Sequence, residues 1–257
     1  MKFISSRNLA LTFTLSCTAG VSAQHVQPWS GYEVHDKKRP HPEKIETKGA
    51  VVTPAPADAE ILFNGKNTDA FTKAWDIVNG VMVATKLGDA HTKKGYGSCQ
   101  LHIEWKIPKG RKVSGQAGGN SGIFFMDRYE IQIQESHKNV TYADGQAGAL
   151  YGQHPPLVNA STPQGEWQSY DIIFTAPVYK DGKLAEPAKI TAFHNGVLIH
   201  NNQTFKGWTS HKVLPKYPAK HPLKAPIRLQ WHGDPIEFRN IWIRDLAKKK
   251  AVAPKQK

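Results

Sequence analysis

Residues 101–107 read Leu-His-Ile-Glu-Trp-Lys-Ile, a segment in which every second side chain is large and apolar. Successive side chains of a β-strand point to opposite faces, so this alternation indicates a strand with one face in a hydrophobic core. Residues 129–134 and 227–232 alternate in the same way. These three segments predict antiparallel sheets that each bury one face.

Turn signals separate further short strands. Asn-Gly pairs at 79–80 and 195–196 each lie between two apolar runs, and each predicts a two-residue hairpin. Residues 170–174 predict another strand. In residues 236–243 the alternation of apolar side chains is interrupted, because Phe238 and Ile241 are out of phase, and this predicts a bulge near Asn240. With no amphipathic helix and no fixed repeat, the pattern favours a two-sheet sandwich or jelly roll over a closed barrel or a propeller.

The composition and the first residues indicate an exported protein. Of 257 residues, 39% are hydrophobic and 10% aromatic, which supports a packed domain and excludes wholesale disorder. Lys2, Arg7, a short apolar run and Val-Ser-Ala predict a signal peptide over residues 1–23, cleaved after Ala23, and hence a secreted or periplasmic location. Cleavage leaves Cys99 as the one cysteine, so no internal disulfide is expected.

The rest of the chain divides into three parts. Residues 24–57 are rich in Pro and Lys and predict a linker or a wrap-around arm. Residues 58–246 hold the predicted sandwich, and residues 247–257 form a basic tail. Removing the signal peptide lowers the net charge from +13 to +11, and the basic clusters near both ends predict solvated extensions. No nucleic-acid motif is present, and no later segment has the ~20 apolar residues of a membrane-spanning helix.

Two predicted strands carry rows of long hydrogen-bonding side chains at intervals of about 7 Å. One row is Glu130, Gln132 and Gln134, and the other is Arg228, Gln230 and His232. Sugar hydroxyls both donate and accept hydrogen bonds, so such mixed rows suit a carbohydrate. The alternative is that both rows are the water-facing sides of ordinary strands.

Two loops offer further candidate ligands of a carbohydrate. The Gly-rich segment 118–122 contains Asn120 and either permits close approach of a ligand or forms a tight turn. Tyr151 either stacks on a sugar face or packs beneath its own loop. The chain has 12 His, but none in a zinc-type spacing, so no metal and no cofactor are predicted. A Ca²⁺ ion held by loop carbonyls would leave little trace in the sequence.

Seven motifs follow one another along residues 58–246. They are Phe63–Lys66, Gly119–Ile123, Tyr129–Ile133, Tyr142–Gly152, Gly165–Gln168, His194–Val197 and Phe238–Ile243. This ordered set resembles the 3-keto-disaccharide hydrolase family, whose members are also described as 3-keto-glucoside 1,2-lyases and 3-keto-2-hydroxy-glucal hydratases. The resemblance implies a concanavalin A-like lectin/glucanase sandwich that acts on oxidised glycosides.

The resemblance gives the polar rows chemical roles. A ketone at C3 of a sugar acidifies the C2 hydrogen, so a base can remove it and expel the C1 substituent, after which water adds back. Glu130 or His232 would be the base and Arg228 the cationic partner of the enolate. Asn120, Gln132, Gln134, Tyr151 and Gln230 would bind the substrate. Alternatively, Glu130 only pairs with Arg228, and His232 only caps a strand end.

Three other functions compete with the elimination. A laminarinase-like glycosidase would use Glu130 and Glu135 as its two carboxylates, but without a bulge these side chains point to opposite faces, and Gln132 stands where that motif has Asp. A carbohydrate-binding module would hold sugar without a base in reach. An envelope-associated structural protein would use the basic tails.

Overall fold

The computed structural model describes residues 25–73 and 75–246. The predicted signal peptide (1–23) and the basic tail (247–257) lie outside the described residues. In the described ranges, nearly all regular structure is antiparallel strand, with one short 3-10 turn, η1 (Ala143–Gly145). No helix in these ranges has the length and apolar character needed to cross a membrane.

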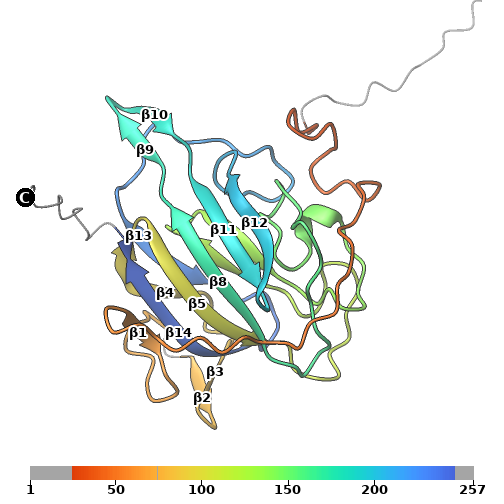
Figure 1. The fold of residues 1–257 in the computed structure, drawn as a ribbon, viewed down its shortest axis with the longest axis vertical. Helices are drawn as coiled ribbons and strands as arrows, with labels where there is room; N and C mark the ends of the chain where they lie inside the picture. The colour runs from red at the N-terminus through yellow and green to blue at the C-terminus, as the bar shows by residue number, and fades with distance from the viewer. Residues whose placement is uncertain (1–24, 74, 247–257) are drawn as a thin grey trace, which may run out of the picture.

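Two antiparallel sheets face each other, with a separate hairpin of β9 and β10 at one end (Figure 1). The large sheet has the order β12-β11-β8-β5-β14-β3-β2, with β1 paired to β14, and the small sheet has the order β4-β13-β6-β7. The large-sheet strands are β1 (Glu60–Phe63), β2 (Asp76–Val78), β3 (Val81–Val83), β5 (Cys99–Lys106), β8 (Gln168–Thr175), β11 (Lys189–His194), β12 (Val197–Thr204) and β14 (Glu237–Asp245). The others are β4 (Ala90–Tyr96), β6 (Ser121–Phe125), β7 (Tyr129–Ile133), β9 (Val178–Lys180), β10 (Lys183–Glu186) and β13 (Ala225–Leu229).

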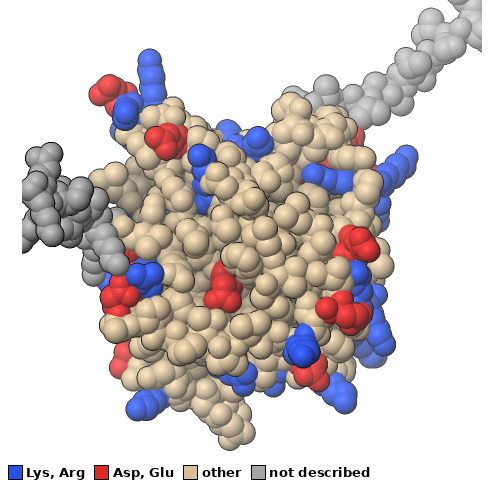
Figure 2. Space-filling model, viewed as in Figure 1, with Lys and Arg blue, Asp and Glu red and all other residues tan. Residues whose placement is uncertain are grey.

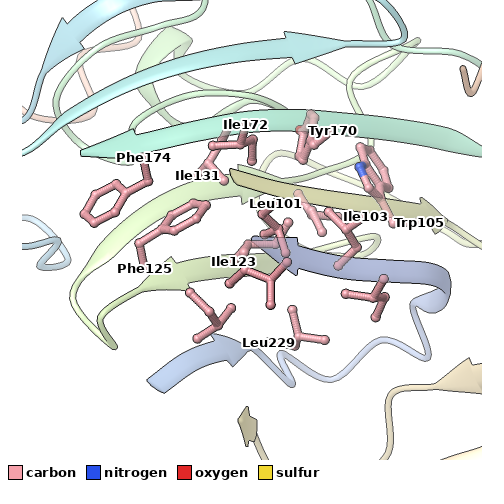
Figure 3. Packing of buried hydrophobic residues seen from close by; sticks show 14 of the residues in the cluster. Leu101, Ile103, Trp105, Ile123, Phe125, Ile131, Tyr170, Ile172, Phe174 and Leu229 are labelled. Carbon is pink, nitrogen blue, oxygen red and sulfur yellow. The ribbon is translucent and has the colours of Figure 1, made fainter. Parts of the chain in front are cut away.

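The hydrophobic core fills the space between the two sheets (Figure 3). Leu101 and Ile103 of β5 and Phe174 of β8 point into it from the large sheet, and Ile123 and Phe125 of β6 point into it from the small sheet. The rings of Phe125 and Phe174 stack across the core with centroids 4.7 Å apart. The predicted all-β sandwich of concanavalin-like, jelly-roll type is confirmed.

The turns occur where the sequence predicts them. Asn79 and Asn195 have φ values of 52°, and the glycine after each is also left-handed, as a type I′ hairpin requires. Asn240 has a φ of 45°, and the β14–β5 register shifts between Arg239 and Trp242. The predicted bulge therefore exists, and it lets both Phe238 and Ile241 reach the core.

The segment before the sandwich, residues 25–57, forms an arm that crosses the outer face of the large sheet (Figure 1, orange). The indole N–H of Trp242 donates to the Thr53 carbonyl at 2.9 Å, and the Val51 N–H donates to Ser169 Oγ at 3.0 Å. His102 and Glu104, on the predicted polar face of β5, are buried at 0% and 1% exposure. The expectation that β5 has one open face is therefore wrong, because a segment distant in the sequence covers it.

The face above the large sheet carries few charged groups at its centre, and most Lys and Arg side chains in this view lie toward its rim (Figure 2). Polar groups beneath the arm are neutralised internally: Arg239 Nε contacts Glu104 Oε2 at 2.6 Å, and His102 Nδ1 contacts Asp171 Oδ1 at 2.7 Å. This face is therefore covered by the arm, and a polar cavity lies on the opposite side of the sandwich.

Candidate active site

A cavity of about 420 Å³ lies on the face of the small sheet that points away from the core. Cross-strand pairing sets its floor. Arg228 of β13 lies opposite Phe124 of β6, which lies opposite Glu130 of β7. In the next row Gly122 lies opposite Gln132. We call this space the sheet cavity.

Seven of the eight residues that the sequence predicts for the site line the sheet cavity. They are Asn120, Glu130, Gln132, Tyr151, Arg228, Gln230 and His232. Gln134 is the exception, and its predicted role in substrate binding is not supported. Its amide is fully buried and donates to the carbonyls of Gly115 and Gly118 at 3.2 and 3.0 Å, so it anchors the Gly-rich loop.

The Glu130 carboxyl group lies over Gly122, enclosed by protein. A Cβ atom at position 122 would come within 2.3 Å of Glu130 Oε1, so only glycine leaves room for the carboxylate. Burial raises the pKa of Glu130 to about 8; the positive charge of Arg228 opposes this, and Asp89 adds to it. With its NH₂ turned toward Glu130, the Gln132 amide donates to Oε1 at 3.0 Å.

Arg228 is held rigidly across the cavity from Glu130. Its Nη1 contacts Asp89 Oδ2 at 2.8 Å, and its Nε contacts Asp127 Oδ1 at 2.6 Å. The guanidinium carbon lies 3.5 Å from the centroid of the Phe124 ring, which adds a cation–π contact. Arg228 therefore takes its ion pairs from two other carboxylates and not from Glu130.

Asn120 and Gln132 form a connected amide network with Gln116. Asn120 Nδ2 donates to the Gln116 carbonyl at 2.9 Å. With the Gln132 NH₂ turned toward Glu130, the Gln132 amide oxygen lies 3.1 Å from the side-chain amide of Gln116. The backbone N–H of Asn120 donates to the buried carboxylate of Asp234, which also accepts from Arg111. These contacts fix the polar wall before any ligand arrives, which favours selective recognition of hydroxyl groups.

Tyr151 also lines the sheet cavity and belongs to an aromatic cluster. Its hydroxyl contacts the Tyr142 hydroxyl at 2.7 Å and His211 Nδ1 at 3.1 Å. His35 of the arm stacks on the Tyr142 ring with centroids 4.1 Å apart. The arm therefore supports the tyrosine pair from outside the sandwich.

His232 lies beyond the end of β13, where it is exposed at the rim. It is close enough to His211 for their charges to interact, since burial, Lys212 and His232 together lower the pKa of His211. Glu130 is enclosed at the floor, whereas His232 has access to water. The two candidate bases thus occupy different environments.

Sequence reasoning missed several lining residues. Gln116, Phe124, Thr209, Ser210 and His211 also line the cavity. Thr209 Oγ1 accepts a hydrogen bond from the Glu130 N–H at 3.1 Å, although 79 positions separate the two residues. Residues 209–211 lie outside the strands, so no periodic pattern could place them at this site.

Glu135, the second carboxylate of the glycosidase alternative, lies elsewhere. Its carboxylate accepts hydrogen bonds from the N–H groups of His137, Lys138 and Asn139 and lines a different cavity. The β6–β7 register is regular through Ile133, so no bulge turns Glu135 toward Glu130. Within the described ranges, no group of three or more His, Cys, Asp or Glu side chains is arranged to hold a metal ion.

Comparisons with known proteins show which chains this one resembles. A family model described as "3-keto-alpha-glucoside-1,2-lyase-like domain" matches residues 58–244. A crystal structure of a candidate glycosyl hydrolase from Parabacteroides distasonis ATCC 8503 is 41% identical, over 80% of this chain and 90% of that one, with a TM-score of 0.73. A second candidate glycosyl hydrolase from that organism is 26% identical over 73% of this chain and 99% of the other, with a TM-score of 0.54. The comparison with curated proteins found no match.

Proposed function

The chain belongs to the family of 3-keto-α-glucoside-1,2-lyase-like domains, and on that premise we propose that it cleaves 3-keto-glycosides by eliminating the C1 substituent. Both the family and its structural neighbours support a carbohydrate-cleaving enzyme. The observation that carries the finer proposal is a buried carboxyl group with a raised pKa, Glu130, in a polar cavity opposite Arg228.

The reaction divides into two balanced steps. A base takes the C2 proton, the C2–H electron pair forms the C1=C2 double bond, and the C1–O bond breaks with its electron pair moving to the leaving oxygen, which takes up a proton. Water then adds across the double bond, placing OH on C1 and H on C2. The C3 ketone makes the first step possible because it delocalises the negative charge that develops at C2.

Glu130 is the proposed base. A carboxylate with a pKa of about 8 is a stronger proton acceptor than an ordinary carboxylate, and about one-tenth of it is ionised at pH 7. The neutral Gln132 amide beside it orients the carboxylate without adding charge. Gly122 leaves the space in which the carboxyl group reaches over the floor.

Arg228 is the proposed stabiliser of the enolate oxygen. Asp89 contacts Nη1 and Asp127 contacts Nε, and these two carboxylates fix the guanidinium at the sheet cavity. A positioned guanidinium in a partly enclosed cavity stabilises developing negative charge without having to reorganise. Asn120, Gln132 and Gln230 then bind the sugar hydroxyls, and Tyr151 forms another part of the wall.

His232 is the proposed proton carrier for the leaving oxygen and for the water that adds afterwards. Its position at the rim, beyond β13, allows it to exchange protons with solvent between the two steps. The group that removes the C2 proton thus lies at the buried floor, and the group that protonates the leaving oxygen lies at the exposed rim. The glycosidase alternative lacks this support, because Glu135 is engaged by three backbone N–H groups in another cavity.

The test compares a 3-keto-glucoside with the unoxidised glucoside, with the release of the aglycone as readout. Wild type should cleave only the keto sugar, and in D₂O the product should carry deuterium at C2. Glu130→Gln should lower kcat by about 10²–10⁴-fold and His232→Ala by about 10²-fold. Glu135→Gln is the matched control and should retain activity.

Other outcomes would contradict the proposal. Cleavage of both glucosides, lost in Glu135→Gln, would indicate a classical glycosidase. Binding without cleavage would indicate a carbohydrate-binding module. Wild-type rates in both Glu130→Gln and His232→Ala would remove the assigned base and proton carrier.

The proposal includes export from the cytoplasm, based on the predicted signal peptide at residues 1–23. Amino-terminal sequencing of the protein recovered from the medium or periplasm should begin at Gln24. Recovery of the uncleaved chain in the cytoplasm would contradict this.

A further inference from the structure

A second cavity, of about 520 Å³, adjoins the sheet cavity and shares Gln116 and His211 with its wall. Another part of its wall comes from the arm, through Lys37 and His41. Both arm residues precede residues 58–244, which the family model matches. We call this space the arm cavity, and it is built in part from residues outside the family domain.

The side chains that line the arm cavity are basic or neutral. Lys37, His41, His211 and Lys212 contribute to its wall, and no Asp or Glu of the described ranges lines it. Neither lysine has an ion-pair partner within 4.0 Å among the described residues, whereas Arg228 in the neighbouring cavity has two. The arm cavity therefore holds positive charge that the protein does not neutralise locally.

Neighbouring groups respond to this positive charge. Burial first, and then His211 and Lys212, lower the pKa of His35 to about 4. The nearby carboxylate of Asp144 does not line the cavity, because it is enclosed and faces Arg39 at 3.9 Å. An anion entering the cavity would find cations and no competing carboxylate.

The walls of the arm cavity are held in place. His35 stacks on Tyr142, and His41 Nε2 contacts the Thr141 carbonyl. The Tyr142 hydroxyl contacts Tyr151, which lines the sheet cavity. The arm is thus joined to the wall that separates the two cavities, and the distance between them is fixed.

We propose that the arm cavity binds the leaving group of the substrate, and that this leaving group carries an anionic substituent such as a carboxylate or a phosphate. The inference rests on the proposed function, which places the keto sugar in the sheet cavity. Gln116 borders both cavities, so a glycosidic bond passing beside it would carry the second sugar toward Lys37 and Lys212. The arm then selects the leaving group, and the sheet cavity performs the chemistry.

The experiment uses three 3-keto-disaccharides that differ only in the second sugar, which is a neutral hexose, a uronic acid or a hexose 6-phosphate. kcat/KM is measured for wild type, Lys37→Gln, Lys212→Gln and the double variant. Lys183→Gln, on the exposed strand β10, is the matched control. Wild type should prefer one charged substrate over the neutral one by about tenfold or more, and the preferred charge identifies the anion.

Each lysine substitution should reduce that preference by about three- to tenfold and leave kcat/KM for the neutral substrate unchanged. The Lys183→Gln control should match wild type on all three substrates. Added salt should reduce it as well. Equal wild-type rates on all three substrates would overturn this inference and leave the proposed function standing. Loss of rate on the neutral substrate in the lysine variants would also overturn it. Cleavage of none of the three would refute the proposed function and, with it, the inference.

Discussion

Replacing Glu130 by Gln should stabilise the protein at high pH and leave its stability nearly unchanged at low pH. Burial raises the pKa of Glu130 from 4.5 to about 8 in the folded chain. Between these pH values the folded state holds a proton that the unfolded state has lost. The free energy of unfolding of wild type therefore falls as the pH rises from about 4.5 to about 8, and then levels off.

The structure sets the size of this effect. The pKa of Glu130 rises from 4.5 in the unfolded chain to about 8 in the folded chain. At about 1.4 kcal/mol per pKa unit, this difference corresponds to a free energy of at most about 5 kcal/mol. The Gln132 amide donates a hydrogen bond to the ionised carboxylate, which offsets part of its desolvation. We therefore expect Glu130→Gln to exceed wild type by about 2–4 kcal/mol at pH 9 and by less than about 1 kcal/mol at pH 5.

Urea unfolding at pH 5 and pH 9 measures both differences. Other titrating groups are shared by the two proteins and cancel in the comparison. Glu46→Gln, at an exposed carboxylate, is the control and should differ from wild type by about 0.5 kcal/mol or less at both pH values. A Glu130→Gln difference that is the same at pH 5 and pH 9 would refute the reasoning, because it would mean that the carboxyl group ionises as easily in the fold as in the unfolded chain.

Further predictions concern activity and the arm. In wild type, kcat/KM should rise with pH to a plateau above about 8 as Glu130 ionises; a flat profile between pH 6 and 9 would exclude this carboxylate as the base. Gly122→Ala should lower kcat by about 10- to 100-fold, because the new Cβ would lie 2.3 Å from Glu130 Oε1 and displace the carboxylate. Steady-state rates equal to those of wild type would contradict the assigned position of Glu130. Trp242→Phe removes the hydrogen bond to the Thr53 carbonyl and should lower the free energy of unfolding by about 1 kcal/mol. Amide hydrogen exchange in residues 50–53 should become faster. Unchanged exchange in these residues would show that this contact does not hold the arm.

Local pattern was sufficient to predict the sandwich because each strand needs only its own alternation and a turn at its end. The Asn-Gly pairs at 79–80 and 195–196 adopt left-handed conformations that few other residues accept, so two residues predict a hairpin. The out-of-phase Phe238 and Ile241 similarly required a bulge. In each case the physical constraint lies within a few residues of the signal.

Strand periodicity predicted only part of the candidate site, because Asn120, Tyr151, Gln230 and His232 also line the cavity but lie outside the strands. Glu130 and Gln132 lie on β7, and Arg228 lies on β13, so their shared face follows from alternation. Gln134 continues the same alternation, but β7 ends at Ile133, and the loop at 115–118 covers the position that follows. His211 could not be found in this way, because its place depends on a long connection between β12 and β13. Contacts between loops distant in the sequence carry no periodic signal.

The turn between β6 and β7 connects the fold with the proposed chemistry. Met126 and Asp127 have φ values of 52° and 59°, a left-handed conformation that costs a non-glycine residue about 1–3 kcal/mol. Glycine would satisfy this turn at lower energy, but it has no side chain. Asp127 instead places its carboxylate 2.6 Å from Arg228 Nε, and Asp89 contacts Nη1 at 2.8 Å. The strain in the turn is therefore coupled to the orientation of the guanidinium, as expected if Arg228 must already be in position when charge develops on the sugar.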